Sequence, residues 1–284
     1  MKIGWIVHPR NLVVYVVLVA AAVLTVRFSL TPWIVGTVLA TLLAVYYFVL
    51  PALALHGLPK FDNELRKLLV GGDPDKLLAF YKSHLMLRAF APPGLMKHRL
   101  GQVHAARRVW PLAFQSYYEC MRAARVKDRF PLLLGYAEAG FHAGEDEQIR
   151  SALVEVAKDP RVMSPATFML VHVMIAGGSK PKVIRKVLDE WQDTAVSDGD
   201  RTVFALAEAE ALALEGKRSR ALERLSEVDR DLLPEAIRPL ATLLEAKIHH
   251  VEGRPKKARR LFEEVRKDPA AGRARLELGE FLED

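Results

Sequence analysis

Two long apolar runs at the start of the chain limit its fold more than any other feature. Residues 1–59 contain no Asp or Glu, and the apolar runs cover about residues 9–28 and 33–55. A helix of about 20 residues is about 30 Å long, which is enough to cross the hydrocarbon core of a bilayer, and the longer second run can cross it with a tilt. The sequence therefore predicts a transmembrane helical hairpin over residues 1–59.

Two other readings of this segment fit less well. A signal peptide would be followed by a cleavage site of small residues, whereas here a second apolar run follows at once. A buried hairpin of a soluble protein is disfavoured because no charged residue lies between Arg27 and Lys60. Arg27 is the one cation of the turn, and five cations flank the two spans: Lys2, Arg10, Lys60, Arg66 and Lys67. Because positive charge favours the cytoplasmic side, we expect both termini in the cytoplasm.

The remainder of the chain has the composition of an ordinary folded domain. All 34 acidic residues lie at or beyond Asp62, beside 38 of the 41 Lys and Arg residues, so this part is only mildly basic. A dedicated nucleic-acid binder usually concentrates a stronger positive field, and nucleic acid is therefore not an expected partner. The single cysteine, Cys120, excludes an intramolecular disulfide and a Cys-rich zinc site, and we expect it to be a small buried side chain.

A helix–turn–helix unit repeats through residues 60–269. The segments EALALEGKRSRALERL (210–225) and KIHHVEGRPKKARRLF (247–262) each have an apolar helix, a glycine turn and a basic stretch. The same turn recurs every 34 to 38 residues, at Gly72, Arg108, Gly144, Gly178, Gly216 and Gly253. A fixed period of this length is typical of solenoids built from stacked helix pairs.

Three columns of similar residues support this register. Small or apolar residues stand seven positions before the turn residues, at Leu65, Gly101, Ala137, Val171, Ala209 and Ala246. Apolar residues stand five positions after them, at Leu77, Ala113, Ile149, Val183, Ala221 and Ala258. Larger residues stand nine positions after them, at Tyr81, Tyr117, Leu153, Val187, Leu225 and Phe262. Small side chains in each helix let the two backbones approach, and the larger side chain fills the space behind them.

The period, the helical hairpins and the small and large columns resemble those of the tetratricopeptide repeat (TPR) family. Pro160 and Pro269 also resemble the proline that this family has between repeats. The resemblance implies an all-α fold, with the hairpin followed by a TPR-like α-solenoid of about six helix pairs over residues 60–284. Residues 270–284 form a half-charged helix that we expect to cap the last repeat. The order of two spans and then repeats is similar to that of bacterial inner-membrane TPR proteins associated with heme synthesis, which implies a bacterial inner membrane.

The same resemblance suggests a binding face, because TPR-like solenoids bind peptides or helices on a concave wall formed by the first helix of each pair. A polar residue stands six positions before every turn residue. We call this set the polar column: Arg66, Gln102, Glu138, His172, Glu210 and Lys247. The alternative is that it is simply the solvated stripe of each amphipathic helix.

A second candidate, which we call the basic-aromatic surface, comprises Lys97, Arg99, Arg107, Arg108 and Trp110. Cations beside an aromatic side chain can bind RNA, anionic lipid headgroups or an acidic protein, and a solvated helix face is the commonest reading of such a run.

The sequence contains no recognised catalytic motif, neither a phosphate-binding loop nor HExxH nor GxSxG. No two of the nine histidines are three or four residues apart, so none share a helix face as a metal pair would. We therefore expect no enzyme activity, no cofactor and no metal. The predicted function is a membrane-anchored adaptor or scaffold that binds a protein or peptide partner in the cytoplasm. The alternative is a structural or assembly subunit of a larger membrane complex, and a homo-oligomer is compatible with both.

Overall fold

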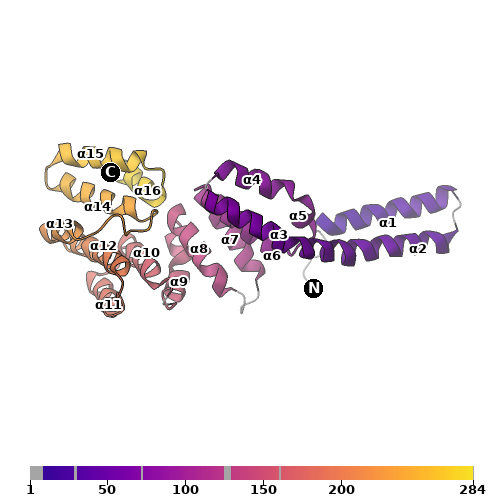
Figure 1. Cartoon of the computed structure of the whole chain (residues 1–284), viewed down its shortest axis with the longest axis horizontal. Coiled ribbons are helices and arrows are strands. Elements are labelled where there is room, and N and C mark those ends of the chain that lie inside the picture. The colour runs from indigo at the N-terminus through magenta and orange to yellow at the C-terminus, as the bar shows by residue number, and fades with distance from the viewer. Residues whose placement is uncertain (1–8, 29–30, 72, 125–128, 160, 284) are drawn as a thin grey trace. The chain divides into compact units, whose positions relative to one another are not determined.

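The computed structural model of the chain describes residues 9–28, 31–71, 73–124, 129–159 and 161–283. These residues form sixteen α-helices, one π-helical turn and no β-strand, which confirms the all-α prediction for the described part (Figure 1). Lys2, Gly72 and Pro160 lie outside the described residues. The chain divides into two compact units, Met1–Met96 and Lys97–Asp284, and each is considered by itself below.

The first unit contains one long continuous helix, which is made up of three consecutive elements. After α1 (Pro9–Phe28), the chain continues through α2 (Pro32–Ala44), a π-helical turn (Val45–Val49) and α3 (Leu50–Gly71) without a break. Pro51 lies just after the π-helical turn, and a proline there cannot donate to the carbonyl one turn earlier. Helix α3 passes straight through residues 59 and 60, where the sequence predicts the domain boundary. The unit is completed by α4 (Pro74–Ser83), α5 (Leu85–Phe90) and the start of α6 (Pro93–Ala106).

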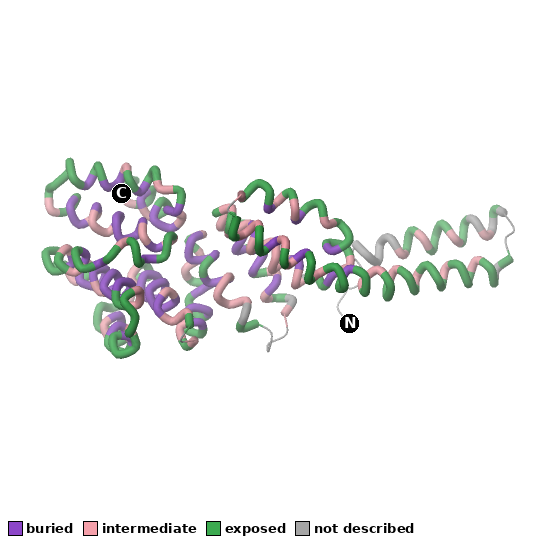
Figure 2. The backbone as a smooth tube through the Cα atoms, in the orientation of Figure 1, coloured by how far each residue is buried: buried purple, intermediate pink, exposed green. Residues whose placement is uncertain are grey.

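One helix in the described residues, Trp33–Gly71, is long and apolar enough to cross a membrane, and α1 contributes a shorter apolar segment, Val14–Val23. The apolar side chains of both helices are largely exposed, as the green and pink stretches of Figure 2 show. Trp33 and Phe48 are examples, with 70% and 75% of their surface exposed. Length and composition thus allow one span, and the two-span hairpin stays a prediction.

The second unit is a succession of packed helix pairs, compatible with a helical repeat solenoid. Its helices after α6 are α7 (Trp110–Ala123), α8 (Phe130–Ala143), α9 (Asp146–Val156), α10 (Met163–Ala176), α11 (Pro181–Gln192), α12 (Asp198–Leu214), α13 (Arg218–Ser226), α14 (Arg238–Val251), α15 (Pro255–Lys267) and α16 (Gly272–Glu283). Proline stands at the first or second position of five of them, where its missing N–H is no loss: α7, α8, α11, α14 and α15.

The turns within these pairs share one backbone conformation, and the sequence register locates it. Among the described residues, the positive φ angles belong to Arg108 (56°), Gly144 (80°), Gly178 (68°), Gly216 (75°) and Gly253 (74°). These are the five described turn residues of the repeat. After each one, the next N–H donates to the carbonyl five residues earlier, as in Arg254 to His249 at 2.9 Å. This is the Schellman ending of a helix, which favours glycine because φ is positive. The predicted turn register is therefore confirmed at these positions.

The predicted columns are buried in all but one pair. Tyr117 packs its ring against Gly101, where a Cβ atom would lie 3.0 Å from the ring, so the large residue does fill the space beside the small one. The exception is α10–α11, where the predicted core residue Val183 is 49% exposed while Ile184 is fully buried. Helix α11 begins three residues after its turn glycine, whereas α9, α13 and α15 begin two residues after theirs. This extra turn residue shifts the buried face of α11 by one position, and the prediction for Val183 was wrong.

The last helix, α16, packs against α14 and α15, as expected of a cap, and also against α8, which the sequence did not predict. Arg273 and Leu278 of α16 are buried. Arg273 donates two hydrogen bonds of 2.8 Å to the Asp146 carboxylate at the start of α9. Helix α16 therefore joins the last helix pair of the second unit to an earlier one.

Candidate functional site

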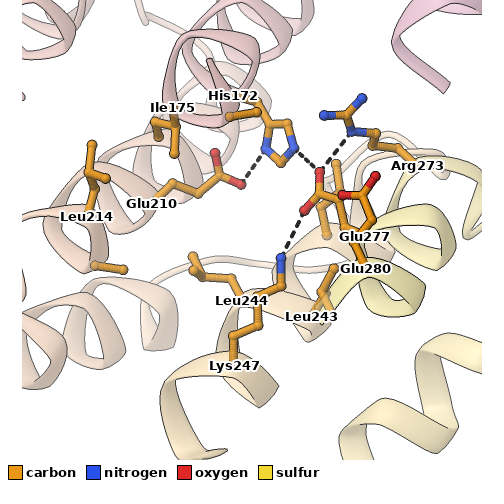
Figure 3. A pocket seen from close by; sticks show the side chains of 13 residues that line it. His172, Ile175, Glu210, Leu214, Leu243, Leu244, Lys247, Arg273, Glu277 and Glu280 are labelled. Carbon is orange, nitrogen blue, oxygen red and sulfur yellow. Dashed lines mark hydrogen bonds and ion pairs between the residues drawn. The ribbon is translucent and has the colours of Figure 1, made fainter. Parts of the chain in front are cut away.

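A cavity of about 350 Å³ lies among the first helices of three successive pairs and α16 (Figure 3). Helices α10, α12 and α14 supply most of its walls, and α16 closes one side. The lining combines leucine-rich surface with a cluster of ionisable side chains: His172, Ile175, Ala176, Glu210, Ala213, Leu214, Leu240, Leu243, Leu244, Lys247, Arg273, Glu277 and Glu280.

His172 is the centre of the ionisable cluster. Its Nδ1 lies 2.8 Å from Glu210 Oε1, and its Nε2 forms a short hydrogen bond with Glu277 Oε1. Figure 3 shows the ring held between the two carboxylates. An ionised carboxylate only accepts hydrogen bonds, so both ring nitrogens must donate, and His172 is an imidazolium cation.

The pKa of His172 agrees with this geometry. Burial alone would lower the pKa of the ring, but the charges of Glu210 and Glu277 outweigh that effect and raise it to about 10. For Glu277, burial would raise the pKa of the carboxyl, but His172, Lys247 and Arg273 hold it well below its usual range. The cluster is thus a set of mutually dependent charges that are removed from water together.

Glu277 accepts more bonds than any other carboxylate in the cavity. Its Oε1 accepts from His172 and from Arg273 Nε at 2.8 Å, and its Oε2 accepts from Lys247 Nζ at 3.1 Å. All three partner atoms belong to cations, so this one carboxylate of α16 is bonded to both α10 and α14. Three members of the cluster, His172, Glu210 and Lys247, belong to the polar column.

A second buried histidine, His142, has the opposite charge state. It stacks on Trp110 with ring centroids 4.3 Å apart, and only 3% of its surface is exposed. Burial, together with the nearby charges of Arg273 and His172, lowers the pKa of His142 to about 4. His142 is therefore neutral where His172 is charged.

Two acceptor groups at the cavity are left without a donor in the described residues. Glu210 Oε2 is buried and has no hydrogen-bond partner there, although Glu210 Oε1 is bonded to His172. Glu280 is exposed on α16, and no described side chain forms an ion pair with it.

The other half of the polar column is placed elsewhere. Arg66 belongs to the first unit and is exposed, and Glu138 is exposed on α8. Gln102 on α6 is half-buried and accepts a long hydrogen bond of 3.4 Å from Arg99. The structure therefore brings together only the last three residues of the column.

The basic-aromatic surface is engaged in several separate contacts. Lys97 forms an ion pair with Glu119 at 2.5 Å, and Arg108 forms one with Glu235 at 2.6 Å. Trp110 is half-buried and stacks on His142. The Arg99 guanidinium lies beside the His98 ring, and Arg107 also interacts with other groups of the protein, so neither side chain is unengaged. Arg125 and Lys127, which continue the basic run, lie outside the described residues.

Sequence reasoning did not identify Arg273, Glu277 or Asp146 as site residues. The only signal was the charge of residues 270–284, which suits an exposed cap equally well. Cys120 is buried as predicted, and burial raises the pKa of its thiol, so it is protonated at neutral pH.

Across the described residues, no group of three or more His, Cys, Asp or Glu side chains is arranged to hold a metal ion. No protein-family model, no curated protein and no solved structure matches the chain.

Proposed function

We propose that the chain is a membrane-anchored scaffold of the TPR-like class, whose second unit captures a partner protein by accepting a side chain into the cavity between α10, α12, α14 and α16. The observation that carries the proposal is the position of this cavity on the first helices of three successive pairs. In TPR-like solenoids these helices form the ligand-binding wall. The sequence predicted the same wall from the polar column.

The position of α16 restricts what such a partner could be. Because Arg273 and Glu277 occupy part of this wall, a long extended peptide cannot run along it without displacing α16. The remaining cavity suits one inserted side chain with leucines around it. Apolar pockets with a few polar groups are the usual form of such binding sites.

The membrane part of the proposal depends on the exposed apolar surface of the first unit. Two spans over α1 and the first part of the Trp33–Gly71 helix, with both termini in the cytoplasm of a bacterial cell, would hold the second unit near the bilayer. Tethering would raise the effective concentration of any partner in the same membrane.

Site-directed photo-crosslinking in membranes tests this function. A photoreactive amino acid replaces Leu214, which lines the cavity and is 41% exposed, or Val183, which is 49% exposed on the second helix of a pair. We expect one discrete crosslinked protein at position 214 and none at position 183. The same crosslink at both positions, or none at 214, would contradict a partner site in this cavity.

One observation favours the second candidate, a structural subunit of a larger membrane complex. A shallow groove between α1 and α2 is lined in part by the small residues Ala21, Ala22 and Gly36, and the space around Gly36 is open. Small residues allow another transmembrane helix to approach closely. Substitution Gly36→Leu should then dissociate the complex in mild detergent, whereas it should leave a simple adaptor unaffected.

A further inference from the structure

We propose that the side chain accepted by this cavity is a basic one, the lysine or arginine of a partner protein, with its alkyl stem against the leucines and its charge at Glu280, on the exposed side of the cavity. The inference rests on the proposed function, because it specifies the chemistry of the group that the same cavity captures.

The hydrogen-bonding capacity of the cavity supports a donor ligand. All three cations of the lining are already paired: His172 with two carboxylates, Arg273 with Asp146 and Glu277, and Lys247 with Glu277. Among the described residues of the lining, the groups that still lack a hydrogen-bond or ion-pair partner are acceptors, namely Glu210 Oε2 and the Glu280 carboxylate. An anionic ligand would find no unpaired cation in this lining.

The burial of Glu210 makes its unused oxygen significant. Glu210 has only 7% of its surface exposed and lines the cavity. Buried carboxylate oxygens rarely lack a donor in folded proteins, because leaving one unpaired is costly. Figure 3 shows this second oxygen turned away from His172 and towards Ile175, and it has almost no accessible surface, so a bound cation would act on Glu210 through space and not by a direct bond. Glu280, on the exposed side, would meet an incoming cation first.

Charge and shape point to the same ligand. Counting Asp146, which pairs with Arg273, the cluster has one more carboxylate than cation. Leu214, Leu243 and Leu244 supply an apolar wall for an alkyl stem. The volume of about 350 Å³ leaves room for one long side chain.

Methyl NMR of the full chain in lipid nanodiscs tests the inference. The probes are N-acetyl-arginine amide, N-acetyl-norleucine amide and N-acetyl-glutamate amide, which differ in the charge at the end of the side chain. We expect the arginine probe to shift the Ile175, Leu214 and Leu244 methyl signals with an affinity at least about tenfold above that of the norleucine probe. The glutamate probe should not shift them.

Two variants locate the effect. Glu280→Gln should remove most of the preference for arginine over norleucine. The matched control is Glu283→Gln, which changes an exposed carboxylate on the same helix that does not line the cavity, and it should keep the preference. Glu210→Gln is a second test at the inner end and should weaken the preference further inside the cavity; because it removes a bond to His172, an unchanged methyl signal of the buried Ile184 is the sign that the fold is intact.

The outcomes separate this inference from the proposed function. Equal binding of the arginine and norleucine probes, or an unchanged preference in Glu280→Gln, would overturn the basic-ligand inference, while a crosslink at position 214 would still support partner capture. Selective arginine binding without any crosslinked protein would instead refute the captured partner, and with it the proposal that the cation belongs to a protein.

Discussion

At the scale of single residues, His172 holds the cavity together because it is a cation between two carboxylates. Replacing it with glutamine would leave Glu210 and Glu277 buried without their shared partner. Removing one member of a buried ion pair costs about 3–5 kcal/mol. We therefore expect His172→Gln to lower the free energy of unfolding of the second unit by about that amount, measured by chemical denaturation of the full chain in detergent.

The controls for this prediction come from the same cluster and the same column. Adding Glu210→Gln to His172→Gln neutralises the carboxylate whose hydrogen bond was to His172 alone, whereas Glu277 keeps Arg273 and Lys247, so the double variant should recover part of the stability. Glu138→Gln, at the equivalent position of α8 but exposed, should stay within about 0.5 kcal/mol of the natural chain. A small effect of His172→Gln would mean that the two carboxylates are not ionised together.

The opposite pKa shifts of His172 and His142 predict that the second unit is most stable near neutral pH. The pKa of His172 rises on folding to about 10, so its contribution is complete below the unfolded value of 6.5 and is lost as the pH rises towards 10. The pKa of His142 falls to about 4, so its contribution is present above 6.5 and is lost as the pH falls from 6.5 through 4. Melting temperatures between pH 4 and 10 should therefore decline on both sides.

Variants assign the two limbs of this pH profile. His172→Gln should flatten the alkaline limb. His142→Phe, which keeps a ring against Trp110, should flatten the decline between pH 6.5 and about 5, where ordinary carboxylates are still ionised. An acid limb that is unchanged in His142→Phe would show that other groups cause it.

At the scale of helices and turns, the five described turn residues are the points where the backbone demands positive φ. An alanine there costs about 1–2 kcal/mol, so Gly253→Ala should destabilise the second unit by that amount. The matched control is Gly279→Ala inside α16, where a Cβ atom meets open space and a better helix former should add up to about 1 kcal/mol.

Arg108 is the informative exception among the turns, because it adopts φ of 56° with a side chain. Arg108→Gly relieves this conformation but loses the exposed ion pair with Glu235, which is worth under about 1 kcal/mol. We expect a net stabilisation of the second unit in thermal melts. Destabilisation would show that the contact with Glu235 outweighs the backbone.

Helix periodicity and turn chemistry are local properties, and for that reason the sequence predicted the all-α fold, the turn residues and most core positions. The displaced core of α11 depends on one added residue in the turn GSKP, which a fixed register cannot detect. The polar column was predicted as one face, yet only His172, Glu210 and Lys247 meet. What joins them is Glu277, and the approach of α16 to α10 depends on packing between segments about a hundred residues apart.

At the scale of the whole chain, the number of spans decides on which side of the membrane the cavity lies. If α1 and the following apolar helix both cross, the two ends of the chain are on one side, and the five cations that flank the spans place them in the cytoplasm. If only the Trp33–Gly71 helix crosses, the ends lie on opposite sides.

Reporters fused separately to each end distinguish these topologies. We expect a reporter that works only in the cytoplasm to be active at both ends, with both fusions retained in carbonate-washed membranes. Activity of a periplasm-only reporter at one end would reduce the hairpin to a single span, and its activity at both ends would reverse the orientation and move the cavity away from any cytoplasmic partner.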